Sequence, residues 1–243
     1  MKIAVCIHLF YTDMFDEIKS YLNNLKHPYD LYVSLVNGFF ENEIVDKLKS
    51  FKQDVKIVYV ENKGVDIGGF LQVLKIVDPT TDLILKLHTK KGIGLPEIPS
   101  NSVKRHGFEI AKKNANNWFK ALMNGVLSDD KKVNKIINTF KTDEKCGMVG
   151  FRLYNSYGVN KKEIENLMPI LNLKNNIFDY HFIGGTIFWV RYPIIKKYFT
   201  KEVIDYILKN TKEGYVLEPS IMHAVERIFG YITENEKQNI LVL

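Results

Sequence analysis

The sequence predicts an α/β protein built on a doubly wound, mainly parallel sheet that is flanked by helices. Apolar runs of strand length, rich in β-branched residues, alternate with segments whose apolar residues recur at helical spacing. Most of these runs end in polar or glycine-bearing loops, and strand–helix repeats of this kind favour parallel strands. The 243 residues, of which 46% are hydrophobic and 26% charged, suit a single folded domain over residues 1–243.

Six segments have the composition of strands. The first is apolar enough to be buried on both faces of the sheet, and the last contains Gly184, Gly185 and Thr186, which indicate a bulge or a close backbone approach. The predicted strands are Lys2–Phe10, Leu31–Val36, Val55–Val60, Leu83–His88, Cys146–Phe151 and Phe178–Val190.

Helical spacing of apolar residues marks the segments between these strands, and Thr12 and Asp13 are candidate caps for the first helix. Glycine and proline breakers between Gly94 and Pro99 interrupt the alternation, so residues 93–145 are predicted to form a helical insertion. The predicted helices are Met14–Leu25, Ile44–Phe51, Phe70–Val77, Phe108–Met123, Val133–Phe140, Ile194–Tyr198 and Leu217–Gly230.

Composition limits the class of partner and the compartment. The net charge of +6 and pI near 9.0 permit anionic partners, but no arginine-rich arm, zinc spacing or aromatic RNA-binding signature is present, so nucleic acid is not expected. Cys6 and Cys146 lie far apart in apolar runs, which indicates reduced, buried thiols. The opening apolar run is too short for a membrane span and lacks a cleavage site, so a cytoplasmic protein is expected.

Two loops that follow predicted strands, at residues 62–66 and 88–91, carry the first candidate site. Ligands of open α/β sheets bind outside the carboxyl ends of the strands, so both loops are expected to face one crevice. Lysines there would match phosphate charge and a carboxylate would accept from hydroxyls, which suits a phosphorylated sugar or nucleotide; the alternative is a solvated turn with ordinary surface lysines. The predicted donor-binding residues are His8, Asn62, Gly64, Asp66, Lys86, His88, Thr89, Lys90 and Lys91.

The predicted helix near the carboxyl terminus carries the second candidate site. Pro219 suits the first turn of that helix, which would place Glu218 at its amino-terminal mouth. His223, Glu226 and Arg227 are three and four residues apart and share one side of the helix. The alternative is an exposed, salt-bridged surface.

Four ordered blocks carry a resemblance to a known family: NKGVDIGGFL at Asn62–Leu71, LILKLHTKKG at Leu83–Gly92, FIGGTIFWVR at Phe182–Arg191 and HAVERIFG at His223–Gly230. With these blocks the chain resembles the rhamnan synthesis protein F family of bacterial polysaccharide glycosyltransferases, and more loosely the GT-A-type glycosyltransferases. The resemblance implies a nucleotide-sugar-binding half at residues 1–92 and an acceptor-side half at residues 146–243, where Arg191 and Arg227 would contact the acceptor.

The resemblance further implies inverting transfer of a sugar, such as rhamnose or another deoxyhexose, from a nucleotide sugar to a polysaccharide or a lipid-linked glycan. Inversion needs a carboxylate base. Glu218 is the favoured candidate, Glu226 is the other, and His223 is near enough in sequence to tune the latter. Peripheral contact with the inner face of the cell membrane is an open alternative to a purely cytoplasmic location.

The chain departs from the GT-A pattern at the end of its fourth predicted strand. GT-A enzymes usually place a metal-binding Asp-x-Asp motif there, whereas this chain has His88, Thr89 and Lys90. Cationic side chains could replace the metal in stabilising the leaving diphosphate, so no metal cofactor is predicted. A divalent metal recruited by Asp66 or Asp82 is the alternative.

Two other function classes compete with a glycosyltransferase. A catalytically inert glycan-binding or scaffolding subunit would keep the same fold, and only activity with nucleotide sugars would distinguish it. A dinucleotide-binding oxidoreductase ranks last, because no G-x-G-x-x-G motif follows the first predicted strand.

Overall fold

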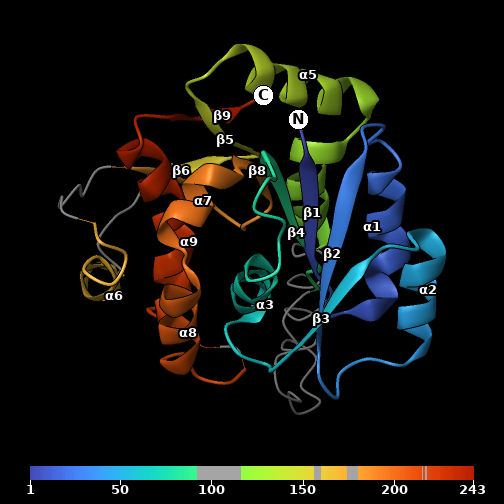
Figure 1. The fold of residues 1–243 in the computed structure, drawn as a ribbon, viewed down its shortest axis with the longest axis horizontal. Coiled ribbons are helices and arrows are strands. Elements are labelled where there is room, and N and C mark those ends of the chain that lie inside the picture. The colour runs from blue at the N-terminus through green and yellow to red at the C-terminus, as the bar shows by residue number, and fades with distance from the viewer. Residues whose placement is uncertain (92–115, 156–159, 174–179, 215, 217) are drawn as a thin grey trace, which may run out of the picture.

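A computed structural model describes residues 1–91, 116–155, 160–173, 180–214, 216 and 218–243. A seven-stranded sheet with the order β3-β2-β1-β4-β8-β5-β9 forms its centre (Figure 1). All neighbouring strands are parallel except β8, which runs antiparallel to both β4 and β5. The main-sheet strands are β1 (Ile3–His8), β2 (Tyr29–Val36), β3 (Lys56–Val60), β4 (Leu83–His88), β5 (Cys146–Gly150), β8 (Phe188–Arg191) and β9 (Asn239–Val242). The predicted α/β class is confirmed, and the mostly parallel sheet is consistent with a GT-A-like fold.

Helices cover both faces of this sheet, and two further strands, β6 (Leu153–Asn155) and β7 (His181–Ile183), form a separate antiparallel pair. The helices are η1 (Thr12–Met14), α1 (Phe15–Leu22), α2 (Glu43–Phe51), α3 (Val65–Leu74), α5 (Asp130–Thr142), α6 (Lys161–Leu167), α7 (Tyr192–Tyr198), α8 (Lys201–Lys209) and α9 (Ile221–Asn235); residues 116–127 are also helical. In Figure 1, α3, α7, α8 and α9 lie on one side of the sheet and α1 and α2 on the other.

Two apolar cores lie on the opposite faces of the sheet. The alternation predicted for β4 is confirmed, because Leu83, Leu85 and Leu87 belong to one core and Ile84 belongs to the other. Lys86 follows the same alternation, so this charged side chain lies on the face covered by α3 and α9, where only a paired charge is tolerated.

The segment predicted as a helical insertion falls partly outside the described residues, which exclude residues 92–115. The helical residues that follow belong to the core that contains Leu83, Leu85 and Leu87. Phe119 and Leu122 are buried there, and the Trp189 indole donates to the Val126 carbonyl at 3.2 Å. Residues 116–127 and α5 therefore cover one face of the sheet together with α1 and α2.

Helix α3 starts earlier than predicted, so Asp66 lies in its first turn and not in a loop. Glycines in this stretch suggest a loop, but each of the three lies where a larger side chain would clash or would strain the backbone. Gly64 precedes the helix with φ +73°, a left-handed conformation that favours glycine. A Cβ on Gly68 would lie 1.8 Å from the Lys63 carbonyl oxygen, and one on Gly69 would lie 2.0 Å from the His8 ring.

The predicted strand Phe178–Val190 is wrong, because its described part divides between β7 and β8, which belong to different sheets. Gly185 (φ +82°) and Thr186 (φ +53°) are both left-handed and form the turn between them. A strand cannot continue through two such residues, so the chain leaves one sheet and enters the other here.

Two predicted helix starts are also wrong. Neither Thr12 nor Asp13 caps α1, since both fall within the short 3-10 helix that precedes it. Helix α9 begins at Ile221, and its cap is Ser220, whose hydroxyl accepts from the backbone N–H of His223. Pro219 therefore lies before the helix.

Both cysteines are free and buried, as predicted. Burial raises the pKa of the Cys6 thiol, and it raises the pKa of Cys146 to about 12, so neither thiol is ionised near neutral pH.

Within the described residues, none of the helices combines the length and apolar character that crossing a membrane requires.

Candidate functional site

Polar side chains from several elements meet where β1 and β4 end. These strands are neighbours and pair His8 with His88. The first turn of α3, the turn between β7 and β8, and the second turn of α9 bring the remaining groups. We call this group the carboxyl-edge cluster; its members are His8, Asp66, Lys86, His88, Thr186 and Glu226.

Lys86 lies fully buried at the centre of the cluster. Its ammonium donates to Asp66 Oδ2 at 2.6 Å and to the carbonyl and hydroxyl oxygens of Thr186 at 2.9 and 3.0 Å. Burial lowers the pKa of Lys86, and the neighbouring Asp66 carboxylate opposes that shift. Because an ammonium has only three N–H groups, Lys86 holds other residues in place and has none left for a ligand.

Asp66 is the charged partner that Lys86 requires. Burial alone would raise the pKa of this carboxyl, but His88, Lys86 and the hydrogen bonds from Lys86 and Thr186 outweigh burial and hold the pKa well below its ordinary value. All of these contacts reach Oδ2. Among the described residues nothing donates to Oδ1, and 21% of the side chain is exposed, so an ionised oxygen is available to a ligand.

Thr186 completes the arrangement, although the sequence analysis gave it no role in binding. Its hydroxyl donates to Asp66 Oδ2 while accepting from Lys86. The residue is buried and has φ +53°, an uncommon value for a β-branched side chain. The turn between β7 and β8 therefore holds a strained residue where it fixes the orientation of Asp66.

His8 is a neutral, buried member of the cluster. Its Nδ1 lies 2.9 Å from the Ser34 hydroxyl oxygen at the end of β2. Burial lowers the pKa of His8 to about 4, an effect that the Asp66 carboxylate only partly opposes. Its imidazole is therefore uncharged at neutral pH.

His88 links the end of β4 to the turn between β7 and β8. Its Nδ1 lies 3.0 Å from the carbonyl oxygen of Thr89, and its Nε2 lies 2.8 Å from that of Gly185. Burial lowers the pKa of His88, while Asp66, whose Oδ2 lies 3.9 Å from Nε2, raises it. Both ring nitrogens face carbonyl oxygens, so a neutral imidazole donates to one of them and a protonated imidazole donates to both; in either form His88 holds backbone in place.

Glu226 is the second carboxylate of the cluster. Its Oε1 accepts from the backbone N–H of Gly185 at 2.8 Å, and its Oε2 lies 3.7 Å from Arg227 Nη1. Burial raises the pKa of Glu226, and the Gly185 hydrogen bond and Arg227 oppose this shift only in part. A raised pKa brings a carboxylate closer to the range in which it can exchange a proton at neutral pH.

Glu218 lies beside the cluster in a different environment. Its Oε1 forms an ion pair with Arg227 and accepts from the Asn160 amide at 2.5 Å. The side-chain carbonyl oxygen of Asn160 in turn accepts from the backbone N–H of Ser220, at 3.1 Å. Arg227 therefore bridges Glu218 and Glu226, and it stacks on Phe182, with 5.0 Å from the guanidinium carbon to the ring centroid.

His223 is half-buried and lies next to this group. Its Nδ1 lies 2.7 Å from the Ser220 hydroxyl oxygen, and burial lowers its pKa, an effect that Glu218 opposes. The structure thus brings His223 next to Ser220, the cap of α9.

The two predicted loops differ in what they leave free. Thr89 is buried, and its hydroxyl oxygen accepts from the backbone N–H groups of Phe10 and Tyr11 at 3.1 and 3.0 Å. Lys91 pairs with Asp13 and lies over the Tyr11 ring, 5.2 Å from its centroid. Among the described residues, the Lys90 ammonium has no hydrogen-bond or ion-pair partner.

The loop before α3 is shaped by backbone contacts. The carbonyl oxygen of Asn62 accepts from the backbone N–H of Gly214 at 2.7 Å, so this loop lies against the segment before α9. A Cβ on Gly64 would lie 2.7 Å from the end of the Met222 side chain on α9. Gly64 thus allows α3 and α9 to approach each other beside the cluster.

Arg191 is not brought to the cluster. It pairs with Leu83 at the opposite end of β4, and its guanidinium donates to the carbonyl oxygens of Phe140, Asp143 and Cys146. These contacts fasten α5 and β5 to β8, so the structure gives Arg191 a role in the fold.

The residues at the end of β4 do not fit a divalent metal site. Metals of this class prefer carboxylate and carbonyl oxygens, whereas His88 and Thr89 are engaged with backbone and Lys90 carries a positive charge. Asp82 lies just before β4, at the opposite end of this strand from His88, where it accepts from the backbone N–H of Lys2 at 2.6 Å. Within the described ranges, no three histidine, cysteine or acidic residues gather as metal ligands would.

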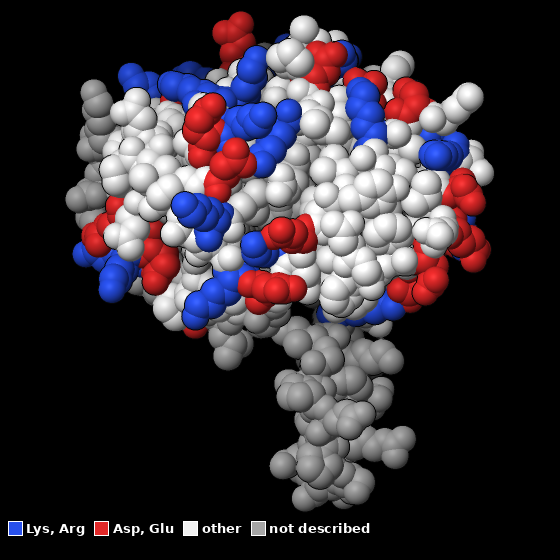
Figure 2. Space-filling view, turned by 60° about the horizontal axis from the view of Figure 1, so that its bottom comes forward, with Lys and Arg blue, Asp and Glu red and all other residues white. Residues whose placement is uncertain are grey.

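Charge on the surrounding surface is mixed. Figure 2 turns the lower end of Figure 1, where β1 and β4 finish, toward the viewer, and it shows positive and negative side chains interleaved over that face. Ligand recognition there would rest on a few positioned groups and not on a broad field of one sign.

Comparison with known proteins identifies a family. The model for rhamnan synthesis protein F matches residues 1–238. Two curated relatives from two strains of Xanthomonas campestris pv. campestris, both described as uncharacterized protein WxcX, are 21% identical over 236 residues. These alignments cover 93% of this chain, and the chain spans 30% of the length of each relative. The chain therefore belongs to the rhamnan synthesis protein F family, which its description links to polysaccharide synthesis.

Proposed function

We propose that this chain is a glycosyltransferase domain that moves a sugar from a nucleotide-sugar donor to a growing polysaccharide or lipid-linked glycan. The observation that carries the proposal is Asp66, an ionised carboxylate fixed through one oxygen by Lys86 and Thr186, with its other oxygen free of partners among the described residues. It lies at the carboxyl edge of a mostly parallel sheet, where such folds bind ligands. The family description supports rhamnose or another deoxyhexose as the sugar.

In this proposal Asp66 Oδ1 accepts from hydroxyl groups of the donor. Lys90, which has no partner among the described residues, faces the diphosphate, and Lys91 contributes after leaving Asp13. Charge-assisted contacts of this kind stabilise the leaving group as negative charge develops on it. The proposal passes no step through a metal, because Lys90 and Lys91 would supply the positive charge that faces the diphosphate.

The base in this proposal is a carboxylate of the α9 segment. The acceptor oxygen attacks the anomeric carbon and its proton passes to the carboxylate, while the nucleoside diphosphate leaves with the electrons of the broken carbon–oxygen bond. Glu226 suits this role better than Glu218, because its pKa is raised by burial and its Oε2 lies 3.7 Å from the nearest cation. Glu218 is tied to Arg227 and Asn160, so we propose that it positions Arg227.

A panel of nucleotide sugars would test the function. Thermal shift should identify one donor class, since a ligand present at 100 times its dissociation constant stabilises a fold by about 2.7 kcal/mol. Transfer to a rhamnan acceptor should then be measurable. Absence of transfer with every donor, alongside glycan binding, would instead favour an inert glycan-binding subunit.

Matched variants would test the roles. Asp66→Asn should weaken donor binding, whereas Glu226→Gln should reduce turnover by about a hundredfold or more with donor affinity nearly unchanged. Glu218→Gln is the comparison: if it is the inactive variant and Glu226→Gln is active, the two carboxylates must exchange roles. Lys90→Ala should weaken donor binding more than Lys91→Ala, because only Lys91 has a protein partner among the described residues.

A further inference from the structure

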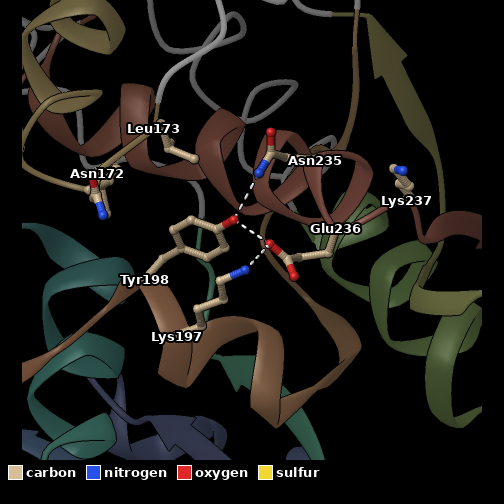
Figure 3. Close-up of a pocket in the computed structure, with 8 residues that line it drawn as sticks. Asn172, Leu173, Lys197, Tyr198, Asn235, Glu236 and Lys237 are labelled. Carbon is tan, nitrogen blue, oxygen red and sulfur yellow. Dashed lines mark hydrogen bonds and ion pairs between the residues drawn. The ribbon is translucent and has the colours of Figure 1, made fainter.

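A hollow of about 630 Å³ lies at the carboxyl-terminal ends of α7 and α9, at the other end of α9 from the carboxyl-edge cluster. Figure 3 shows the side chains around it. Leu171 and Leu173 supply apolar surface. The polar groups are Asn172, Lys197, Tyr198, Asn235, Glu236 and Lys237. Such a volume is in the range of small-ligand sites.

Hydrogen bonds hold part of this lining in place. The Tyr198 hydroxyl donates to Glu236 Oε1 and accepts from the Asn235 amide nitrogen at 2.8 Å, and Lys197 donates to the same Glu236 oxygen at 2.6 Å (Figure 3). Burial alone would raise the pKa of Glu236, but Lys197 and Tyr198 lower it. The polar face of the hollow is therefore formed without a ligand, which reduces the ordering that a ligand must bring about.

The same contacts leave both acceptors and donors free. Among the described residues, the side-chain carbonyl oxygen of Asn235 and Glu236 Oε2 have no hydrogen-bond or ion-pair partner. The Lys237 ammonium has none either. A carboxylate with free lone pairs disfavours an anion, and two lysines disfavour a cation. A neutral ligand whose hydroxyls can both donate and accept, and whose C–H faces can cover the leucines, fits this chemistry; a sugar has both properties.

A second hollow of about 460 Å³ adjoins the first, because Lys237 lines both. Leu153, Ile240 and Leu241 are among the apolar residues that line it, and Gln238 and Asn239 are among the polar ones. Two adjoining hollows suit an extended chain better than a single small molecule.

We propose that the two hollows bind sugar residues of the polysaccharide acceptor, away from the end that receives the new sugar. The inference rests on the proposed function. Glu226 of the cluster and Asn235 of the hollow are nine residues apart on helix α9, which corresponds to about 13 Å along the helix. A long acceptor could therefore contact both regions at once, and a second contact raises affinity by making its binding intramolecular.

The test uses the full chain and two probes, a rhamnan disaccharide and a rhamnan fragment long enough to follow α9. Calorimetry without donor should show tighter binding of the long fragment. Asn235→Ala should weaken that binding by about tenfold and leave the disaccharide affinity and the donor affinity unchanged. Lys237→Ala provides a second variant if Asn235→Ala unfolds, because the Lys237 ammonium has no hydrogen-bond or ion-pair partner among the described residues. Asn138→Ala makes the same asparagine change at an exposed position of α5 and should alter nothing.

Each outcome is decisive. Equal binding of the long fragment by wild type, Asn235→Ala and Lys237→Ala would overturn the proposal, as would an equal loss for both fragments. If transfer to the disaccharide occurs but chain length brings no gain, the proposed function stands and the acceptor site falls. If no donor supports transfer while long-fragment binding depends on Asn235, the proposed function falls and the glycan site stands.

Discussion

The buried ion pair between Lys86 and Asp66 is the residue-scale feature on which the candidate site depends. Removing one partner of a buried pair leaves an uncompensated charge. Lys86→Met is therefore expected to lower the free energy of unfolding by about 3–5 kcal/mol in urea titrations. Lys75→Met, which breaks an exposed pair with Asp205, is the control and should cost less than about 1 kcal/mol.

The double variant Asp66→Asn with Lys86→Met separates charge from packing. It removes both charges, so its unfolding free energy should exceed that of Lys86→Met alone. Donor binding should nevertheless remain weak in it, because the ionised oxygen is gone. A double variant as unstable as Lys86→Met would show that lost packing, and not the charge of Asp66, causes the destabilisation.

The buried His8 predicts a pH dependence of stability. An unfolded histidine binds a proton near pH 6.5, whereas the pKa of His8 is lowered to about 4 in the fold. Between these values the unfolded state gains a proton that the native state lacks, so stability falls as pH falls from 6.5 to 4, by up to about 3 kcal/mol. Below pH 4 this contribution no longer changes.

Urea unfolding at several pH values would measure this dependence. His8→Gln should flatten it in part, since burial also lowers the pKa of His88. His27→Gln, which changes an imidazole bonded to Asn134 at the surface, should leave the slope as it is in the wild type. An unaltered slope in His8→Gln would contradict the assignment.

For single residues, the sequence predicted the side of a strand on which a residue lies better than it predicted which distant residues that residue contacts. Period-two alternation placed Lys86 and His88 on one side of β4, and this is confirmed. It could not identify Thr186, because that residue lies 100 positions from Lys86 and meets it only through tertiary packing. Asn160, which fixes Glu218 from 58 positions away, carried no local signal.

Among the elements, α9 has a requirement that helix propensity would not suggest. Replacing a helical glycine by alanine usually stabilises a helix by about 1 kcal/mol. A Cβ on Gly230, however, would lie 2.0 Å from the His181 carbonyl oxygen and 2.7 Å from Phe182 Cα in β7. Gly230→Ala is therefore expected to destabilise the protein by about 1–3 kcal/mol, measured by urea unfolding. A stabilised variant would show that β7 moves away at little cost.

Elements with strong local patterns were predicted well. β4 matches its predicted bounds, and β1, β2, β3 and β5 lie within two residues of theirs at each end. Elements that depend on tertiary context were missed. The short strands β6 and β9 are formed by pairing with other segments, and the turn that separates β7 from β8 lies between two apolar runs that resemble one strand.

For the whole molecule, the charge arrangement at the end of β4 predicts the response to a chelator. Transfer should proceed at an unchanged rate in excess EDTA, because cationic side chains and not a metal would face the diphosphate. Activity lost in EDTA and restored by manganese or magnesium would contradict this and direct attention to Asp66.

Raising the ionic strength should weaken donor binding, since exposed lysine–phosphate contacts are screened by salt.

The position of β8 in the sheet also has a consequence for how the protein is made. β8 lies between β4 and β5, yet its first residues come about a hundred positions after the β4 residues they pair with. A ribosome therefore exposes β1, β2, β3 and β4 long before it has made the strand that covers the open edge of β4. During that interval the Lys86 ammonium has no Thr186 to meet, and an unpaired edge is prone to association with other chains. We expect nascent chains that stop before β8 to need chaperones and to acquire protease resistance only once β8 has emerged.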